Sequence, residues 1–426
     1  MTLVDEIVKK KKGYTLHIIQ TDKYKTNTLV WKMKAPLEKE TVTMRALLPY
    51  VLQSGSEAYP ASTALRAHLD DLYGANFFVD VAKKGDYHIM SFSVEVANER
   101  FLKDKEPLLK QAMDFFHEVL CKPLAKDGSF DEAIVAGEKR NLKHRIQAVY
   151  DDKMRFASVR LLEEMYDGEP YALQSNGYLE AVDPIDPASL FRYYEKAFAE
   201  NEMDLYMVGD IDPHEAEQIA DQLFAFNERP QLPSSAKLAL SRKDKPKIVK
   251  EVQPINQGKL NIGYQTNVVY GDPDYFALQV FNGIFGGFSH SKLFANVREK
   301  ASLAYYAASR VESHKGFLMV LSGIDSKNYD QAVQIIDQQL NAMKKGEISE
   351  KEILQTRAVI RNQLLETADT ARGLIELLYQ NVVARKHVTL DDWLEAVERT
   401  TIEEVTAVAA QVETDTIYFL SGTEDA

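Results

Sequence analysis

One order of predicted elements occurs twice along this chain of 426 residues, and the repetition limits the folds that the chain can adopt. Each half opens with two strands of alternating polarity, continues with two amphipathic helices and an aromatic-rich strand, and closes with a strand that ends in a turn glycine. A spacing of roughly 213 to 231 residues between matching elements indicates a duplicated domain rather than a solenoid. The opening and closing strands are 14–19, 28–33 and 204–209 in the first half, and 248–252, 259–264 and 416–422 in the second.

A polar stretch that contains prolines separates the two halves, which is typical of an exposed linker. We therefore predict an N-terminal domain over residues 1–228, a linker over residues 229–247 and a C-terminal domain over residues 248–426. Strands grouped with long helices indicate an α+β architecture. The amphipathic stretches that predict the long helices are 109–120, 130–149, 154–166 and 350–367.

Charge and apolar content exclude several classes of protein. The formal net charge is −13, which disfavours a nucleic-acid partner on electrostatic grounds. The basic run 9–12 lies in acidic surroundings and is predicted to be a solvated turn. No window is apolar over the length that crosses a bilayer, and no secretory signal is present. The single cysteine, Cys121, has apolar neighbours and is predicted to be a structural thiol in a reducing compartment. We expect a cytoplasmic protein with no membrane span.

The spacing of the histidines argues against a zinc site of the helical type. Such a motif needs two histidines four residues apart, because that spacing places both side chains on one helix face. None of the nine histidines has another histidine four residues away, and a single cysteine excludes a thiolate cluster. Glycine patterns that bind phosphates or dinucleotides are absent, as is the Gly-x-Ser-x-Gly elbow of serine hydrolases. We therefore expect no metal and no cofactor.

The most informative stretch is 281–306, FNGIFGGFSHSKLFANVREKASLAYY. Its helix, Gly-Gly turn, Ser-Lys-Leu-Phe, Arg-Glu-Lys and Leu-Ala-Tyr strand resemble the second-domain signature of the pitrilysin, insulysin and mitochondrial processing peptidase family, the inverted zincins. The resemblance covers nearly the whole chain and is to the short, two-domain bacterial type. It implies two homologous α+β domains, each a mostly antiparallel sheet with helices on one face, that face each other across a chamber.

The first half departs from the family where the zinc should bind. With Gly55 as the anchor, Ala46 and Tyr50 stand at the two histidine positions, and Pro49 stands at the position of the general-base glutamate. Glu138 matches an acid that precedes the third ligand, which places Arg145 at or near the ligand position. A guanidinium stays protonated and repels a cation, and proline removes a helix hydrogen bond. The resemblance therefore implies a zinc peptidase homologue that has lost its own metal site.

The second half keeps residues to which the resemblance gives a role in substrate binding. In short family members, an arginine and a tyrosine at the positions of Arg298 and Tyr305 reach across to the zinc domain and hold the backbone carbonyl of the substrate. Gly286 and Gly287 belong to the same substrate-binding motif. Simpler interpretations also exist: the glycines as a helix cap, Arg298 as half of a solvated ion pair, and Tyr305 as a core residue.

Three functions from different classes follow. The first is a non-catalytic, substrate-binding subunit that binds a peptide or an unfolded polypeptide and donates Arg298 and Tyr305 to the active site of a zinc-bearing homologous partner, as a heterodimer. The second is a non-proteolytic peptide-binding or scaffolding homodimer. The third is a self-sufficient enzyme with relocated metal. The donor pair favours the first, and the missing histidine pair argues against the third.

Overall fold

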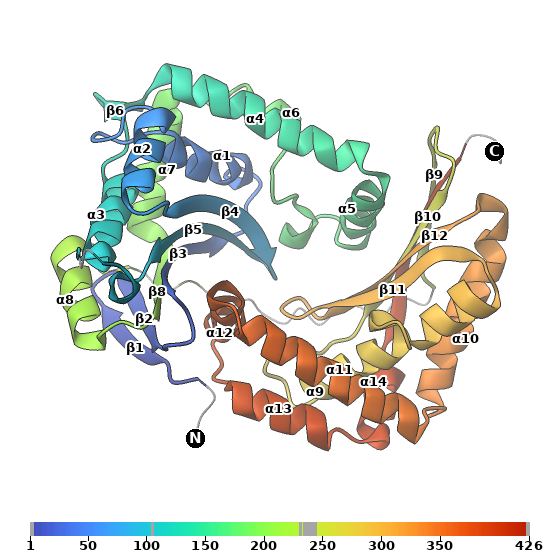
Figure 1. Ribbon diagram of the computed structural model, residues 1–426. Coiled ribbons are helices and arrows are strands. Elements are labelled where there is room, and N and C mark those ends of the chain that lie inside the picture. The colour runs from blue at the N-terminus through green and yellow to red at the C-terminus, as the bar shows by residue number, and fades with distance from the viewer. Residues whose placement is uncertain (1–3, 104–105, 230–231, 233–244, 423–426) are drawn as a thin grey trace. The chain divides into compact units, whose positions relative to one another are not determined.

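The computed structural model describes residues 4–103, 106–229, 232 and 245–422 (Figure 1). The chain separates into two compact units. The first comprises residues 1–148, 173–234 and 369–375, and the second comprises residues 149–172, 235–368 and 376–426. Two segments, 149–172 and 369–375, therefore belong to a different unit from their neighbours in sequence. Most of the predicted linker, 229–247, lies outside the described residues.

A six-stranded sheet forms the centre of the first unit. Its strands lie in the order β1-β2-β8-β3-β5-β4, and all neighbours are antiparallel except the parallel pair β2 and β8. The strands are β1 (Ile7–Lys11), β2 (Tyr14–Gln20), β3 (Thr26–Pro36), β4 (Asn76–Lys84), β5 (Tyr87–Ala97) and β8 (Glu202–Gly209).

The second unit contains a five-stranded sheet of matching topology. Its order is β11-β12-β10-β13-β9, and the pair β9 and β13 is again the parallel one. Both closing strands, β8 and β13, thus lie between the first and second strands of their repeats, which confirms the predicted duplication. The strands are β9 (Lys247–Val252), β10 (Gly258–Gln265), β11 (Ala304–Glu312), β12 (Phe317–Ile324) and β13 (Glu413–Ser421).

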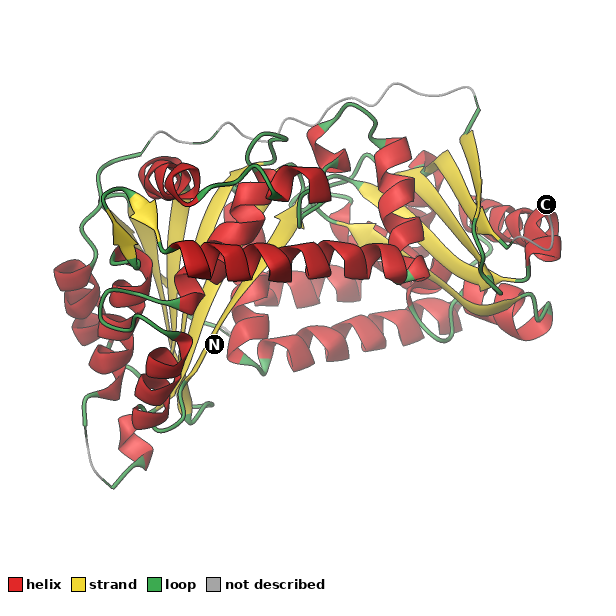
Figure 2. Cartoon of the chain, turned by 90° about the horizontal axis from the view of Figure 1, so that it is seen from above, coloured by secondary structure: helices red, strands yellow, loops and turns green. Residues whose placement is uncertain are grey.

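Helices cover the sheets, and the predicted α+β class is confirmed (Figure 2). In the first unit these helices are α1 (Val42–Ser54), α2 (Ser62–Asp71), α3 (Leu108–Cys121), α4 (Glu132–Asp151), α6 (Leu179–Val182), α7 (Pro187–Glu200) and α8 (Pro213–Leu223). In the second unit they are α5 (Lys153–Met165), α9 (Tyr275–Asn282), α10 (Tyr329–Lys344), α11 (Glu350–Ala368), α13 (Leu390–Arg399) and α14 (Ile402–Gln411). Residues of α12 (Ala371–Ala384) belong to both units. No described helix combines the length and the apolar content that spanning a membrane requires.

Both faces of the second sheet are buried, because α5 covers the face opposite to α9 and α14 (Figure 1). Alternate residues of β13 join different clusters: Ile417 packs with the α9 and α14 side, and Tyr418 packs against Phe156 of α5. A side chain at Gly263 of β10 would meet the sulfur of Met165 at 2.6 Å, so glycine lets α5 lie close to the sheet. The amphipathic period predicts a helix here but does not predict which sheet it covers.

Most of the basic run near the start of the chain is a strand rather than the predicted turn. Lys9–Lys11 lie in β1, which pairs with β2 over five residue pairs. Lys11 donates to Glu217 at 2.6 Å and to Asp221 at 2.8 Å, so α8 neutralises its charge. Lys9, Lys10 and Lys12 are exposed, as predicted, and Lys12 lies in a turn. The strand was missed because local charge does not reveal pairing with a distant acidic helix, which makes a lysine-rich edge strand stable.

A buried histidine joins β2 to the closing strand β8. Nδ1 of His17 lies 2.8 Å from Oε1 of Glu6, and Nε2 lies 3.2 Å from Oδ1 of Asp204. The ring stacks on Tyr206 with 4.2 Å between centroids. Burial lowers the pKa of His17, but the hydrogen bonds to Asp204 and Glu6 outweigh it and raise the pKa to about 9.

We expect the stability of the first unit to depend on the protonation of His17. Because the folded-state pKa is raised, the contribution is fully present below the unfolded value of about 6.5 and is lost as pH rises through about 9. It amounts to roughly 3 kcal/mol at its largest. Urea unfolding of His17→Gln from pH 6 to pH 10 should show a gap to the unmutated protein that narrows with rising pH. The exposed His214→Gln is the matched control and should leave the profile unchanged, and a constant gap for His17→Gln would contradict the prediction.

Candidate functional site

Helix α1 carries three of the predicted site residues and is fixed by the buried Arg45. Nη1 of Arg45 donates to Oδ1 of Asn201 at 2.5 Å and to the hydroxyl of Tyr193 at 3.1 Å. Nη2 donates to the backbone carbonyls of Met33 at 3.0 Å and His88 at 2.9 Å. These acceptors lie on β3, β5 and α7 and beside β8, so one side chain ties α1 to the sheet beneath it.

None of the three positions on α1 offers a histidine or a carboxylate to a metal. Ala46 is fully buried in the core, and Pro49 lies inside the helix, which continues to Ser54. Pro49 has no backbone N–H, so the carbonyl one turn earlier loses its usual helical partner. Tyr50 is half-buried, and burial raises the pKa of its hydroxyl, so the phenol stays neutral at ordinary pH.

The structure brings Tyr50 and Arg145 together. The guanidinium carbon of Arg145, on α4, lies 3.6 Å from the centroid of the Tyr50 ring, a stacked cation–π contact. Glu138 lies two turns before Arg145 on α4. Its Oε1 accepts hydrogen bonds from Ser54 at 3.1 Å and from Asn141 at 3.2 Å, and it does not pair with Arg145. Burial lowers the pKa of Arg145, and the nearby Tyr50 and Glu138 oppose that effect. A fixed cation therefore stands where the resemblance places the third zinc ligand.

These residues do not fit a zinc ion. A structural or catalytic zinc needs at least three nitrogen, sulfur or oxygen ligands in tetrahedral array. Across the described chain, no three His, Cys, Asp or Glu side chains lie close enough together to hold a metal. Cys121 is no alternative, because burial raises the pKa of its thiol to about 12 and keeps it protonated.

The predicted residues of the second unit lie on a run of irregular backbone. Two π-helical segments, η3 (Gly283–Gly287) and η4 (Phe294–Lys300), precede β11. Ser302 has a φ of 53°, which is left-handed and unusual for serine. The register of β11 with β12 shifts between Ala304 and Tyr306, so Tyr305 is the bulged residue. π-Helical turns, bulges and left-handed residues gather at functional sites.

Arg298 and Tyr305 both expose their side chains. Tyr305 is 75% exposed, which excludes the simpler interpretation of a core residue. The side chain of Arg298 is 43% exposed, and its guanidinium lies 4.5 Å from the Phe294 ring and 3.7 Å from Glu299. Within the described residues no hydrogen bond joins Arg298 to Tyr305. Arg298 thus forms an exposed ion pair with Glu299, as the simpler interpretation expects, and both side chains remain accessible from solvent.

Gly286 and Gly287 have a packing role. A Cβ at Gly286 would lie 2.6 Å from Oγ and 2.8 Å from the backbone nitrogen of Ser309, so η3 could not approach β11 with any larger residue. A Cβ at Gly287 would lie 2.9 Å from the side-chain nitrogen of Asn282. Gly286 thus sets the distance between η3 and β11, the strand that begins beside Tyr305, and Gly287 leaves room for the side chain of Asn282.

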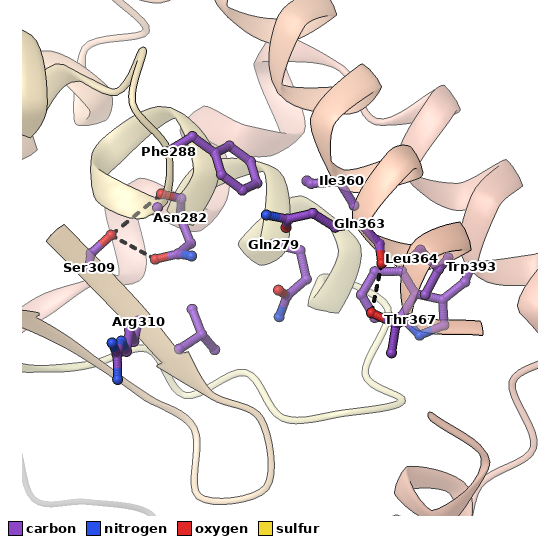
Figure 3. Close-up of a pocket in the computed structure, with 12 residues that line it drawn as sticks. Gln279, Asn282, Phe288, Ser309, Arg310, Ile360, Gln363, Leu364, Thr367 and Trp393 are labelled. Carbon is purple, nitrogen blue, oxygen red and sulfur yellow. Dashed lines mark hydrogen bonds between the residues drawn. The ribbon is translucent and has the colours of Figure 1, made fainter. Parts of the chain in front are cut away.

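A cavity of about 450 Å³ lies beside this glycine pair within the second unit (Figure 3). Its lining is rich in amides and hydroxyls, holds two aromatic rings and contains no carboxylate. Oγ of Ser309 donates to Oδ1 of Asn282 at 2.7 Å and fixes that amide. Of the predicted residues only Gly287 lines the cavity; the lining comprises Gln279, Asn282, Gly287, Phe288, Ser309, Arg310, Val311, Ile360, Gln363, Leu364, Thr367 and Trp393.

Sequence reasoning missed this cavity, although one signal was present. Gln279 and Asn282 are the polar residues of the otherwise apolar and aromatic helix α9, and their spacing of three places them on one face. A polar pair on one face of such a helix indicates a lined cavity or a buried network. The partners from α11 and α13 could not be found in this way, because they lie far away in sequence.

Comparisons with known proteins agree with this geometry. Residues 184–360 match the family model described as the peptidase M16 inactive domain. The chain is 49% identical over 426 residues to the probable inactive metalloprotease YmfF of Bacillus subtilis, with 100% of both chains covered. It is 26% identical over 162 residues to the uncharacterised zinc protease YmxG of the same organism, covering 37% of this chain and 39% of the relative.

A conserved protein of Enterococcus faecalis has a crystal structure that matches with a TM-score of 0.91 and 36% identity, covering 98% of both chains. The chain belongs to the M16 peptidase family and is a homologue of its metalloproteases. The resemblance seen in the motif 281–306 is thereby confirmed.

We expect the purified protein to retain far less than one equivalent of zinc after dialysis, because Ala46 and Pro49 supply no ligand and Arg145 repels a cation. Elemental analysis by mass spectrometry measures the zinc content, with a zinc-bearing member of the family as the positive control. Arg145→Met should bind no more zinc, since removing the charge does not restore the ligands. One equivalent of zinc held near residues 46–50 of the unmutated protein would overturn the assignment.

Gly286→Ala should destabilise the second unit by about 1–3 kcal/mol, because its Cβ must push η3 away from Ser309. Urea unfolding measures this loss. The matched control is Gly137→Ala inside α4, where the nearest atom is 3.8 Å away and the change should stabilise by roughly 0.5–1 kcal/mol. Equal effects of the two substitutions would show that Gly286 has no packing role.

Proposed function

We propose that this chain is the non-catalytic, substrate-binding subunit of a peptide-processing zinc metallopeptidase assembly in the cytoplasm. It donates Arg298 and Tyr305 to the active site of a zinc-bearing homologous partner, as a heterodimer. The observation that carries the proposal is the contrast between the two units. In the first, the positions where the resemblance places metal ligands hold Ala46, Tyr50 and Arg145, whereas the second exposes both donors on a bulged and partly π-helical segment.

The chemistry of the two side chains supports this role. Hydrolysis of an amide creates a negative charge on the carbonyl oxygen, and donors that are already oriented stabilise it without reorganisation. Arg298 offers a permanent cation with several N–H groups, and Tyr305 offers a neutral O–H. A peptide bond held by these donors also needs an activated water, which no residue at positions 46, 49, 50 or 145 can supply. A partner must therefore bring it.

The substrate in this proposal is a peptide or an unfolded polypeptide. The cavity beside Gly287 supports it, since its amide and hydroxyl groups match the hydrogen-bonding groups of a peptide backbone, and Arg310 adds a positive charge to the lining. The same cavity favours a second candidate function, a peptide-binding or scaffolding homodimer that cleaves nothing. In that case Arg298 and Tyr305 would contribute to binding alone.

The test compares Arg298→Ala with the unmutated chain after each is combined with a zinc-bearing homologue from the same cell. Loss of one oriented donor is expected to lower peptide turnover roughly a hundredfold to a thousandfold. Arg298→Lys should recover part of the rate, because lysine offers a point charge without the planar fork. Tyr305→Phe should lose less, since it removes one neutral hydroxyl and keeps the ring.

Arg361→Ala is the matched control, an exposed arginine on α11 of the same unit. It should leave turnover unchanged. Size-exclusion chromatography and zinc analysis must show that each complex still assembles and still holds the partner's zinc. If the Arg298→Ala complex assembles and cleaves at the unmutated rate, the donation is refuted. If no homologue forms a complex with the chain, the homodimer becomes the better candidate.

A further inference from the structure

Arg145 carries a half-buried positive charge that forms no ion pair within the described chain, although Glu138 acts on it electrostatically from further away. Its Nε and Nη2 atoms are buried and have no hydrogen-bond partner. The acid of its own helix that acts on it electrostatically is Glu138, which accepts hydrogen bonds from Ser54 and Asn141 and forms no ion pair with Arg145. A buried charge without a counter-ion destabilises the folded chain. Its presence here needs an explanation.

Tyr50 explains how the guanidinium is held but not how its charge is balanced. The stack at 3.6 Å fixes the plane of the guanidinium and offsets part of its desolvation cost. The ring has no negative charge, and Ala46 and Pro49 add none. Nη1 is not among the buried donors and makes no hydrogen bond with the described chain, so it is the part of the guanidinium that a ligand can reach.

We infer that Arg145, oriented by Tyr50, is a carboxylate-binding site at the position of the lost third metal ligand. A guanidinium recognises carboxylates through charge-assisted hydrogen bonds, and a fixed orientation reduces the entropy lost on binding. The carboxylate can be the C-terminus of a peptide or an acidic side chain within one. This inference does not rest on the proposed function, because it uses neither Arg298 nor Tyr305.

Two acidic residues, Glu138 and Asp80, limit how tightly a carboxylate is expected to bind at Arg145. Glu138 acts electrostatically on Arg145 and, together with Asp80, on Tyr50. Glu138 opposes a further carboxylate at Arg145, and Asp80 adds negative charge beside Tyr50, so binding should be modest. Glu138→Gln removes one of the two charges and keeps an oxygen that accepts from Ser54. This variant should therefore bind a carboxylate several-fold more tightly than the unmutated chain.

The experiment uses three short peptides and the full chain. The first is acetyl-tetra-alanine with a free carboxylate, the second is the same peptide as its amide, and the third is acetyl-Ala-Ala-Glu-Ala-amide. Calorimetry measures affinity, and the side-chain N–H resonance of Arg145 reports contact directly. We expect the free carboxylate or the glutamate peptide to bind roughly tenfold or more tightly than the plain amide. Which of the two binds identifies the source of the carboxylate.

Arg145→Met keeps the aliphatic stem and should abolish the preference for a carboxylate, whereas Arg145→Lys should keep part of it. Arg140→Met is the matched control, because Arg140 is exposed on the same helix, and it should leave the preference intact. Equal affinity for all three peptides, or no binding of any, would overturn the inference. If Arg145→Met fails to fold, the Arg145 resonance of the unmutated protein and the Glu138→Gln effect still decide the question.

Discussion

Each sheet is held together by the strand that closes its repeat. β8 pairs with β2 on one edge and with β3 on the other, and β13 pairs with β9 and β10 in the same way. Without β8, strands β2 and β3 would not be hydrogen-bonded into one sheet, and the same holds for β9 and β10 without β13. These central pairings join residues far apart in the sequence, so a long loop must close before they form. The site residues of both units are placed by elements that rest on these sheets.

The two repeats share one architecture but differ in the residues at their candidate sites. In the first, Tyr50 and Arg145 are in contact at the positions where the resemblance places metal ligands. A guanidinium supplies positive charge but no coordination position, so it can attract an anion and cannot ionise a bound water. In the second, the irregular backbone between Gly283 and Tyr305 has been kept although it includes a left-handed serine and a bulge. Backbone of this kind costs stability and is common at functional sites, which agrees with the binding role proposed for this segment.

The sequence predicted individual strands and helices better than the contacts that they make with distant parts of the chain. Alternation placed β2 and β3 to within a few residues, because period and turn signals are local. The repeated order predicted that the closing strands lie at matching places in the two sheets, but it did not predict the strand order. The π-helical character of the Arg298 segment was missed, since no local pattern distinguishes it from an α-helix. The lysines of β1 were misread because their acidic partners lie on α8. Residue types at positions 46–50 and 145 could be compared with the family, but the contact of Tyr50 with Arg145 needed the fold.

The packing of α5 against the second sheet has a consequence for folding during synthesis of the chain. Phe156 and Leu161 of α5 share a buried cluster with Tyr418 and Leu420, which follow about 260 residues later. A ribosome that adds roughly 5–20 residues per second therefore takes on the order of 10–50 s to supply the missing half of that cluster. During that interval the apolar face of α5 has no native partner on β13. Nascent chains of this protein thus form a population that chaperones can bind, for a time set by translation speed rather than by the folding rate of either unit.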